Sequence, residues 1–175
     1  MRKKTILIVV TITILGLLSY LGYNIISKTK EKNQIAKQLE IVPEFEFLTL
    51  EQQPFNNANL KPKLNAIFIY FNSECDSCQH EAQSINDNLE NFKNVKFLFV
   101  SREPIETIQQ FSEKYKLNNQ QNITFLYDNL DMFSSRFDAN SIPYLLIYNK
   151  NQKLIKKHKG QFNAKGILRV LQQND

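Results

Sequence analysis

Cysteine, histidine and tryptophan are scarce in this chain, which has two Cys, two His and no Trp among its 175 residues. A zinc site built from four protein ligands is therefore not indicated, because two thiols and one nearby imidazole leave its shell incomplete. The sequence also contains no internal repeat and no low-complexity block, so nothing in it indicates a repeat architecture.

An excess of positive charge outside the N-terminal region is absent as well. The whole chain carries a formal net charge of +5, but residues 1–40 hold seven of its 22 Lys and Arg and only two of its 17 Asp and Glu. The rest of the chain is formally neutral, and the basic excess lies where it can meet anionic lipid headgroups. Nucleic acid is therefore not an expected partner.

The N-terminus does contain a long apolar run. Three basic residues, 2–4, precede residues 5–26, which carry no charged side chain. At about 1.5 Å per residue a helix of this length reaches about 33 Å, enough to cross a hydrocarbon core of about 30 Å. No cleavage pattern of small residues follows, and no cysteine lies near to take a lipid. We expect a cytoplasmic tail at 1–4 and an uncleaved transmembrane signal anchor at 5–26.

The segment after the anchor bears on topology. Four lysines between residues 28 and 37 nearly match the basic residues before the span, so the positive-inside rule does not fix the orientation. A short basic tail followed by one apolar span is typical of an exported, periplasmic domain attached to the cytoplasmic membrane; a cytosolic domain is the alternative. We expect a polar stalk at 27–40 and one domain at 41–175.

Apolar periods alternate in type within this domain. Residues 64–71 and 95–100 are nearly continuous apolar runs, as in strands buried on both faces. From Cys75 to Phe92 apolar residues recur at three and four, as in a helix with one buried face. The other expected elements are strands at 44–50, 123–128, 143–149 and 153–159, the last two as a hairpin, and helices from Pro104, near 130–137 and at 164–171. This order predicts an α/β fold, a mixed sheet with flanking helices on both faces.

The two cysteines lie three positions apart in YFNSECDSCQHE, where a buried strand passes into a helix. At a helix N-terminus, unpaired N–H groups and the helix dipole favour the thiolate of Cys75, and only a thiolate attacks a disulfide. Cys78 follows one turn later and can resolve the mixed disulfide. The pattern therefore predicts a redox-active pair that exchanges electrons.

Two other uses of the pair stay open. A structural disulfide that closes about four residues gains roughly 2 kcal/mol from chain entropy, compared with about 3 kcal/mol for a fifteen-residue loop. A soft ion such as copper(I) needs only the two sulfurs. His80 is not expected to join a metal site, because it lies about 200° around the helix from Cys78.

These residues resemble the thioredoxin-like thiol-disulfide oxidoreductases, specifically the membrane-anchored, extracytoplasmic TlpA-like or redoxin group, and the resemblance implies a thioredoxin-like fold over about residues 41–171. It matches Cys75 and Cys78 to the family's nucleophilic and resolving cysteines, Ile142 and Pro143 to the cis-proline segment of the substrate groove, and Glu81 to the acidic residue of a Cys-x-x-Cys-x-x-Glu pattern. Glu81 is then expected to touch the pair and move protons during exchange; a solvated helix carboxylate is the alternative.

The sequence departs from that family at three places. Glu74 stands where Trp commonly precedes the first cysteine, Asp76 lies between the cysteines, and Tyr144 replaces a small hydroxyl residue beside the groove. A unit charge at about 4 Å costs an exposed thiolate about 1 kcal/mol, which roughly cancels a helix-end effect of about 0.3–1 kcal/mol. A thiolate stabilised this little makes a weak oxidant, so we expect a reductant or electron-transfer partner rather than a strong disulfide donor.

Peroxide-reducing relatives are a near alternative. They place Pro and Thr or Ser seven and three residues before the reacting cysteine, whereas Phe68 and Asn72 occupy those positions here. Peroxidase activity is therefore not expected. The basic run at 153–159 is interpreted as protection of a sheet edge.

The sequence thus predicts an enzyme, a thiol-disulfide oxidoreductase that exchanges a dithiol with protein substrates or a redox partner outside the cytoplasmic membrane. Neither a cofactor nor a metal is expected. The alternatives are a copper carrier that uses the same cysteines and a redox-silent thioredoxin-like binding module.

Overall fold

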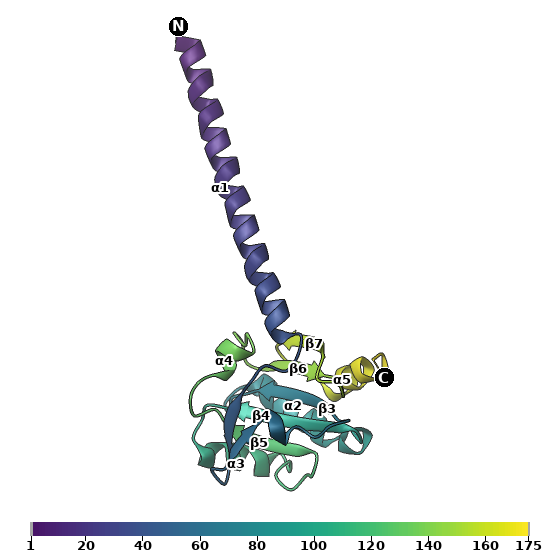
Figure 1. The fold of residues 1–175 in the computed structure, drawn as a ribbon. Helices are drawn as coiled ribbons and strands as arrows, with labels where there is room; N and C mark the ends of the chain where they lie inside the picture. The colour runs from purple at the N-terminus through teal and green to yellow at the C-terminus, as the bar shows by residue number, and fades with distance from the viewer. Residues whose placement is uncertain (1, 175) are drawn as a thin grey trace. The chain divides into compact units, whose positions relative to one another are not determined.

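The chain divides into two units, residues 1–38 and residues 39–175, and the described residues of the first are helical. In this computed structural model, which describes the backbone of residues 2–174 and the side chains of residues 15–30 and 32–174, helix α1 runs from Arg2 to Leu39 (Figure 1). The predicted anchor and all but the last residue of the predicted stalk fall within α1, but the side chains of residues 5–14 and of residue 31 lie outside the described ones. Among the described residues, no helix combines the length and the apolar character that a membrane crossing requires.

The second unit, residues 39–175, contains one seven-stranded sheet with the order β2-β1-β5-β4-β3-β6-β7. The three central strands β5, β4 and β3 are parallel, and every other neighbouring pair is antiparallel. The strands are β1 (Glu46–Thr49), β2 (Pro54–Asn56), β3 (Asn65–Tyr70), β4 (Val95–Ser101), β5 (Ile123–Tyr127), β6 (Tyr144–Tyr148) and β7 (Leu154–Lys159).

Helices cover both faces of the sheet, as the sequence predicts (Figure 1). Residues of α2 (Asp76–Asn86), α3 (Ile105–Lys114) and α5 (Ala164–Gln172) share one buried cluster with the sheet, and the short α4 (Phe133–Arg136) packs on the other face. Two 3-10 turns, η1 (Asn57–Asn59) and η2 (Leu89–Asn91), complete the element order.

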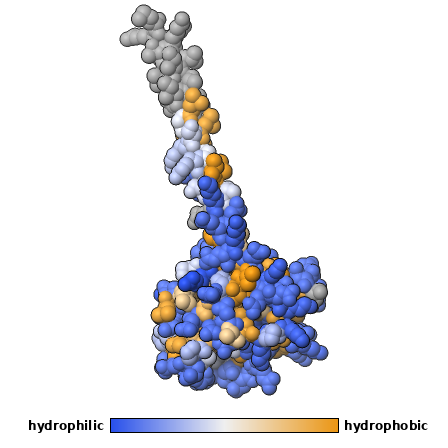
Figure 2. Space-filling model, viewed as in Figure 1, coloured by the Kyte–Doolittle hydropathy of each residue, from blue (hydrophilic) through white to orange (hydrophobic). Residues whose placement is uncertain are grey.

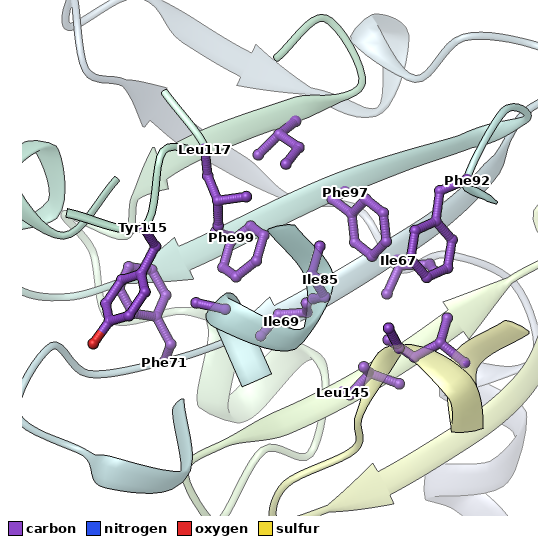
Figure 3. Packing of buried hydrophobic residues seen from close by; sticks show 14 of the residues in the cluster. Ile67, Ile69, Phe71, Ile85, Phe92, Phe97, Phe99, Tyr115, Leu117 and Leu145 are labelled. Carbon is purple, nitrogen blue, oxygen red and sulfur yellow. The ribbon is translucent and has the colours of Figure 1, made fainter. Parts of the chain in front are cut away.

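The core under α2, α3 and α5 is rich in aromatic rings (Figure 3). Side chains alternate along a strand, so Ile67, Ile69 and Phe71 of the β3 segment all point to this face. Phe71 lies near Tyr115 at one end of the cluster, and Phe92 meets Phe97 at the other end with ring centroids 5.0 Å apart. This packing fixes the carboxyl end of β3, from which the cysteine segment departs.

The opposite face holds a second aromatic cluster. Phe68 lies between Ile67 and Ile69 in β3, so its side chain points to this opposite face. The centroid of its ring is 5.0 Å from that of Phe137 and 5.4 Å from that of Phe45. Phe133 stacks on Phe137 at 4.5 Å and on Tyr70 at 4.8 Å. The continuous apolar run in the sequence is thus explained, because β3 is buried on both faces.

Three details differ from the sequence prediction. The three-residue strand β2 and turn η1 were not expected, because so short a segment carries no period. Helix α2 ends at Asn86, and the apolar spacing continues to Phe92 only through the 3-10 turn η2. The helix predicted near 130–137 is a single turn, which begins where Asp128 accepts the N–H groups of Met132 and Phe133, each at 2.9 Å.

The predicted hairpin of β6 and β7 is confirmed, and β7 lies at the sheet edge. Lys157 of β7 pairs with Asp138 at 3.0 Å. In the view of Figure 2, most of the visible surface of the second unit is blue, that is hydrophilic, with small orange hydrophobic patches.

Candidate redox site

Cys75 lies at the N-cap of α2, as predicted. Its backbone is extended (φ −83°, ψ 110°), and its sulfur accepts a hydrogen bond from the N–H of Cys78 at 3.4 Å. The sulfur thus takes the place that a Ser, Thr or Asp oxygen usually has at a helix start. Because this N–H and the helix dipole both favour negative charge, the position suits a thiolate.

Cys78 lies one turn further along α2 and is only 2% exposed, whereas Cys75 is half-buried. Both cysteines are free thiols in this structure. Burial raises the pKa of the Cys78 thiol, and the neighbouring Cys75 and Glu81 act in the same direction. The two sulfurs are therefore unequal: an outer one within reach of a partner and an inner one that is harder to ionise.

The segment Ile142–Pro143 faces the outer cysteine. Its peptide bond is cis, and the carbonyl oxygen of Ile142 lies 4.0 Å from the Cys75 sulfur. Pro143 is buried, while the side chain of Ile142 is 42% exposed. The fold therefore brings together Cys75, Cys78 and this segment, although 67 residues separate Cys75 from Ile142.

Glu81 of α2 is fully buried, so the alternative of a solvated helix carboxylate is wrong. Neither of its carboxylate oxygens makes a hydrogen bond within the described part of the chain. Desolvation raises the pKa of Glu81 from 4.5 to about 8. The backbone of Phe162 acts in the opposite direction on this pKa and is the smaller of the two effects.

His80 is exposed, on the side of α2 away from the buried Cys78. The other histidine, His158, lies against the ring of Phe162, with centroids 4.5 Å apart. Among the described side chains, no group of three or more His, Cys, Asp or Glu residues is placed to hold a metal ion.

A groove lies beside Cys75 at the carboxyl ends of β3 and β4. It consists of two adjoining hollows of about 320 and 360 Å³, and both are lined by Tyr70, Arg102 and Ile142. The carboxyl ends of parallel strands are the usual place for ligands in open α/β sheets. Its wall includes Ile142, whose carbonyl oxygen lies 4.0 Å from the Cys75 sulfur, so the groove adjoins the cysteine site.

Two charged side chains, Arg102 and Glu103, line the groove. Glu74 and Asp76, the two departures beside Cys75, are both exposed to solvent. Arg102 pairs with Asp131 at 2.8 Å, and both of these side chains are more than half exposed. Tyr144, the third departure, is fully buried next to Pro143 and lies outside the cluster that contains Cys78.

Sequence reasoning missed Glu103 in the turn after β4. Its carboxylate accepts hydrogen bonds from the N–H and the hydroxyl of Ser73, two residues before Cys75. The signal was present, since β3 and β4 were both predicted as buried strands, and the carboxyl ends of neighbouring parallel strands lie together. What was lacking was the register that sets Tyr70 opposite Val100.

The sequence profile of the AhpC/TSA family matches residues 39–164, most of the chain. The chain belongs to the AhpC/TSA family. Membership makes it a thioredoxin-like redox protein and an oxidoreductase in the general sense. No curated protein sequence matches this AhpC/TSA member.

Solved structures agree on the fold of this AhpC/TSA member. MTB dsbF has a TM-score of 0.65 at 19% identity, covering 79% of this chain and 97% of its own. A secreted Mycobacterium tuberculosis disulfide oxidoreductase homologous to E. coli DsbE has a TM-score of 0.62 at 21% identity, with coverages of 78% and 98%. A thioredoxin-like protein from Aeropyrum pernix has a TM-score of 0.62 at 13% identity, and the match covers 86% of this chain and 99% of that protein. At these identities the likeness establishes the predicted thioredoxin-like fold.

Proposed function

We propose that this protein is a thiol-disulfide oxidoreductase that reduces disulfides in protein substrates. The proposal rests on the arrangement around the Cys75 sulfur. This sulfur caps α2, Cys78 follows one turn later, and the carbonyl of Ile142 faces the same sulfur. An outer sulfur that can attack and an inner sulfur that can resolve are the two parts that dithiol exchange needs.

Exchange proceeds in two displacements. The Cys75 thiolate attacks one sulfur of the substrate disulfide, so that a mixed disulfide forms and the other substrate sulfur leaves as a thiolate. Cys78 then loses its proton and attacks the Cys75 sulfur, which forms the Cys75–Cys78 disulfide and releases the second substrate thiolate. Two electrons pass from the dithiol to the substrate, and a dithiol donor must then reduce the pair again.

Glu81 supports the second displacement in this proposal. Because burial raises the pKa of the Cys78 thiol, its proton needs an acceptor within the core. Glu81 is three residues further along the same helix, and its charge acts on Cys78. A carboxyl with a pKa of about 8 exchanges protons near neutral pH, so Glu81 is the proposed acceptor.

The segment Ile142–Pro143 shapes the groove for the substrate. The exposed side chain of Ile142 offers an apolar contact, and the backbone beside it runs close to the Cys75 sulfur. An extended peptide on either side of the substrate cysteine would pair with this backbone.

The proposed direction is reduction. A single backbone N–H, from Cys78, is directed at the Cys75 sulfur, while Glu74 and Asp76 place negative charge on either side of it. These charges oppose a strongly stabilised thiolate, and strong oxidants are those whose reduced form is stabilised.

We further propose that α1 anchors the domain to the outer face of the cytoplasmic membrane. Its described part exposes several large apolar side chains: Leu15, Leu17, Leu18, Leu21, Ile25 and Ile26. Figure 2 shows orange hydrophobic patches along this helix. Polar side chains within this part bond to the helix itself, as Asn24 does to the carbonyl of Tyr20 at 3.0 Å. In intact cells, labelling of Cys75 by a membrane-impermeant maleimide tests the location, and labelling only after lysis would contradict it.

The decisive experiment measures the reduction potential of the Cys75/Cys78 pair in the full-length protein against dithiol buffers, together with turnover of a disulfide-containing protein. A potential between about −120 and −270 mV, toward the lower end, is expected with measurable turnover. A potential below about −300 mV would instead indicate a structural disulfide. Stoichiometric copper(I) binding that requires both cysteines, or rapid consumption of hydrogen peroxide, would favour the copper-carrier or peroxidase alternative.

A further inference from the structure

The position of the Cys75 sulfur is decided by a short irregular segment, residues 71–75, between β3 and α2. At its start the N–H of Phe71 bonds to the carbonyl of Val100 at 3.0 Å. At its end the N–H of Cys75 bonds to the carbonyl of Asn72 at 3.3 Å, within the segment itself. Some other contact must therefore hold the middle of the segment to the rest of the fold.

Ser73 makes that contact with every polar group it has. Its N–H donates to Glu103 Oε2 at 2.7 Å, and its hydroxyl donates to Glu103 Oε1 at 2.6 Å. Its carbonyl accepts from the side-chain amide of Gln79 at 2.8 Å. Because Ser73 is two residues before Cys75, these bonds set where the chain enters the helix.

Glu103 is itself fixed to the sheet. The hydroxyl of Ser101 donates to Glu103 Oε2 at 3.2 Å, and the N–H of Glu103 donates to that hydroxyl at 3.2 Å. Ser101, at the end of β4, is 1% exposed, and its carbonyl accepts from the N–H of Asp128 at 2.8 Å. The carboxylate is thus a fixed point at the carboxyl end of β4.

The chemistry of this contact is specific to a carboxylate. Three donors converge on its two oxygens, and hydrogen bonds to a charged acceptor are the stronger kind. A glutamine at position 103 would offer one acceptor and one donor, so part of the contact to Ser73 would be lost. An alanine would remove all of it.

We propose that Glu103 is a positioning residue for thiol exchange, which holds Ser73 so that the Cys75 sulfur stays within reach of Cys78. This role rests on the proposed function for its biological use, but the geometry concerns the two cysteines alone. When Cys75 carries a mixed disulfide, the resolving attack by Cys78 requires the two sulfurs to be held together, and small misplacements slow such steps steeply. Attack by Cys75 on a small reagent in solution makes no such demand.

The test uses an aromatic disulfide, 5,5′-dithiobis(2-nitrobenzoate), on the full-length reduced protein. The Cys75 thiolate attacks it, so that a mixed disulfide forms and one coloured aryl thiolate leaves. Cys78 then attacks the Cys75 sulfur, which forms the intramolecular disulfide and releases the second aryl thiolate. The first release depends on reagent concentration and the second does not, so stopped-flow absorbance separates them.

Glu103→Ala is expected to slow the second release about tenfold or more and to change the first by less than about threefold. Ser73→Ala, which removes one of the two bonds to Glu103, is expected to slow the second release by a smaller factor, as is Glu103→Gln. The double variant Ser73→Ala/Glu103→Ala should show a second release no slower than that of Glu103→Ala alone, because both changes remove the same contact. Glu106→Ala, which removes an exposed carboxylate three residues away, is the matched control and should leave both releases unchanged.

Second-release rates within about twofold of the natural protein in both Glu103→Ala and Ser73→Ala would overturn the proposal. Equal slowing of both releases would overturn it too, since that outcome indicates a general effect on the thiolate or the fold. If Glu103→Ala does not fold, as its thermal midpoint would show, Ser73→Ala decides. A natural protein that completes both releases but reduces no protein disulfide would refute the proposed function and leave this role standing.

Discussion

Replacement of Glu81 by Gln is expected to stabilise the protein by an amount that grows with pH. The carboxyl is fully buried, has no hydrogen-bond partner among the described residues, and has a pKa raised by desolvation to about 8 from an ordinary value of 4.5. An ionised carboxylate in such a place is removed from bulk solvent, and no described residue pairs with it, so its charge is costly. A glutamine of similar shape never ionises, so it avoids this cost at every pH.

The magnitude follows from proton linkage. Between pH 4.5 and about 8 the folded state keeps the Glu81 proton that the unfolded chain releases, so stability falls as pH rises. The stability that the retained Glu81 proton contributes is fully present below pH 4.5 and is lost by about pH 8. At about 1.4 kcal/mol per pH unit the total loss is about 5 kcal/mol, comparable to the whole stability of a marginal domain.

Urea unfolding of the reduced full-length protein and its Glu81→Gln variant, at about pH 5, 6.5 and 8, measures this effect. The advantage of the variant should increase by about 4 kcal/mol from the lowest to the highest pH. Any constant cost of burying the amide cancels in that difference. Glu90→Gln, the same change at an exposed position, is the control. An advantage for Glu81→Gln that is equal at all three values would refute the reasoning.

Three further outcomes are expected. Cys78→Ser should release one aryl thiolate from the aromatic disulfide instead of two and leave a mixed disulfide on the protein, detectable by mass; release of two would contradict the assigned order of attack. Asp128→Ala removes the acceptor for the N–H groups of Met132 and Phe133 and should cost about 1–3 kcal/mol in urea unfolding, whereas an unchanged midpoint would show that α4 starts without it. Phe68→Ala opens a cavity between rings on the α4 face and should cost about 3–5 kcal/mol, and a loss below 1 kcal/mol would mean that this core collapses around the gap.

Local pattern was sufficient for most of the elements. The apolar runs at 64–71 and 95–100 predicted β3 and β4 because both strands are buried on two faces. Such a run can be recognised in the sequence without knowing which strands lie beside it. The junction of β3 with a helix likewise predicted the N-cap position of Cys75. The strand β2 escaped prediction, since three residues carry no period and pair only because β1 lies beside them.

The sequence by itself determined the order of the elements and the spacing of the cysteines, because periods of two and of three to four are local properties of the chain. Helical spacing also set Glu81 near Cys78, since residues three apart share a face. Only the tertiary structure decided that Glu81 is sealed from water, because sealing depends on which distant segments pack over α2. The same holds for Ile142 beside Cys75 and for Glu103 on Ser73: each pair joins segments 30 or more residues apart, and strand register decides their meeting.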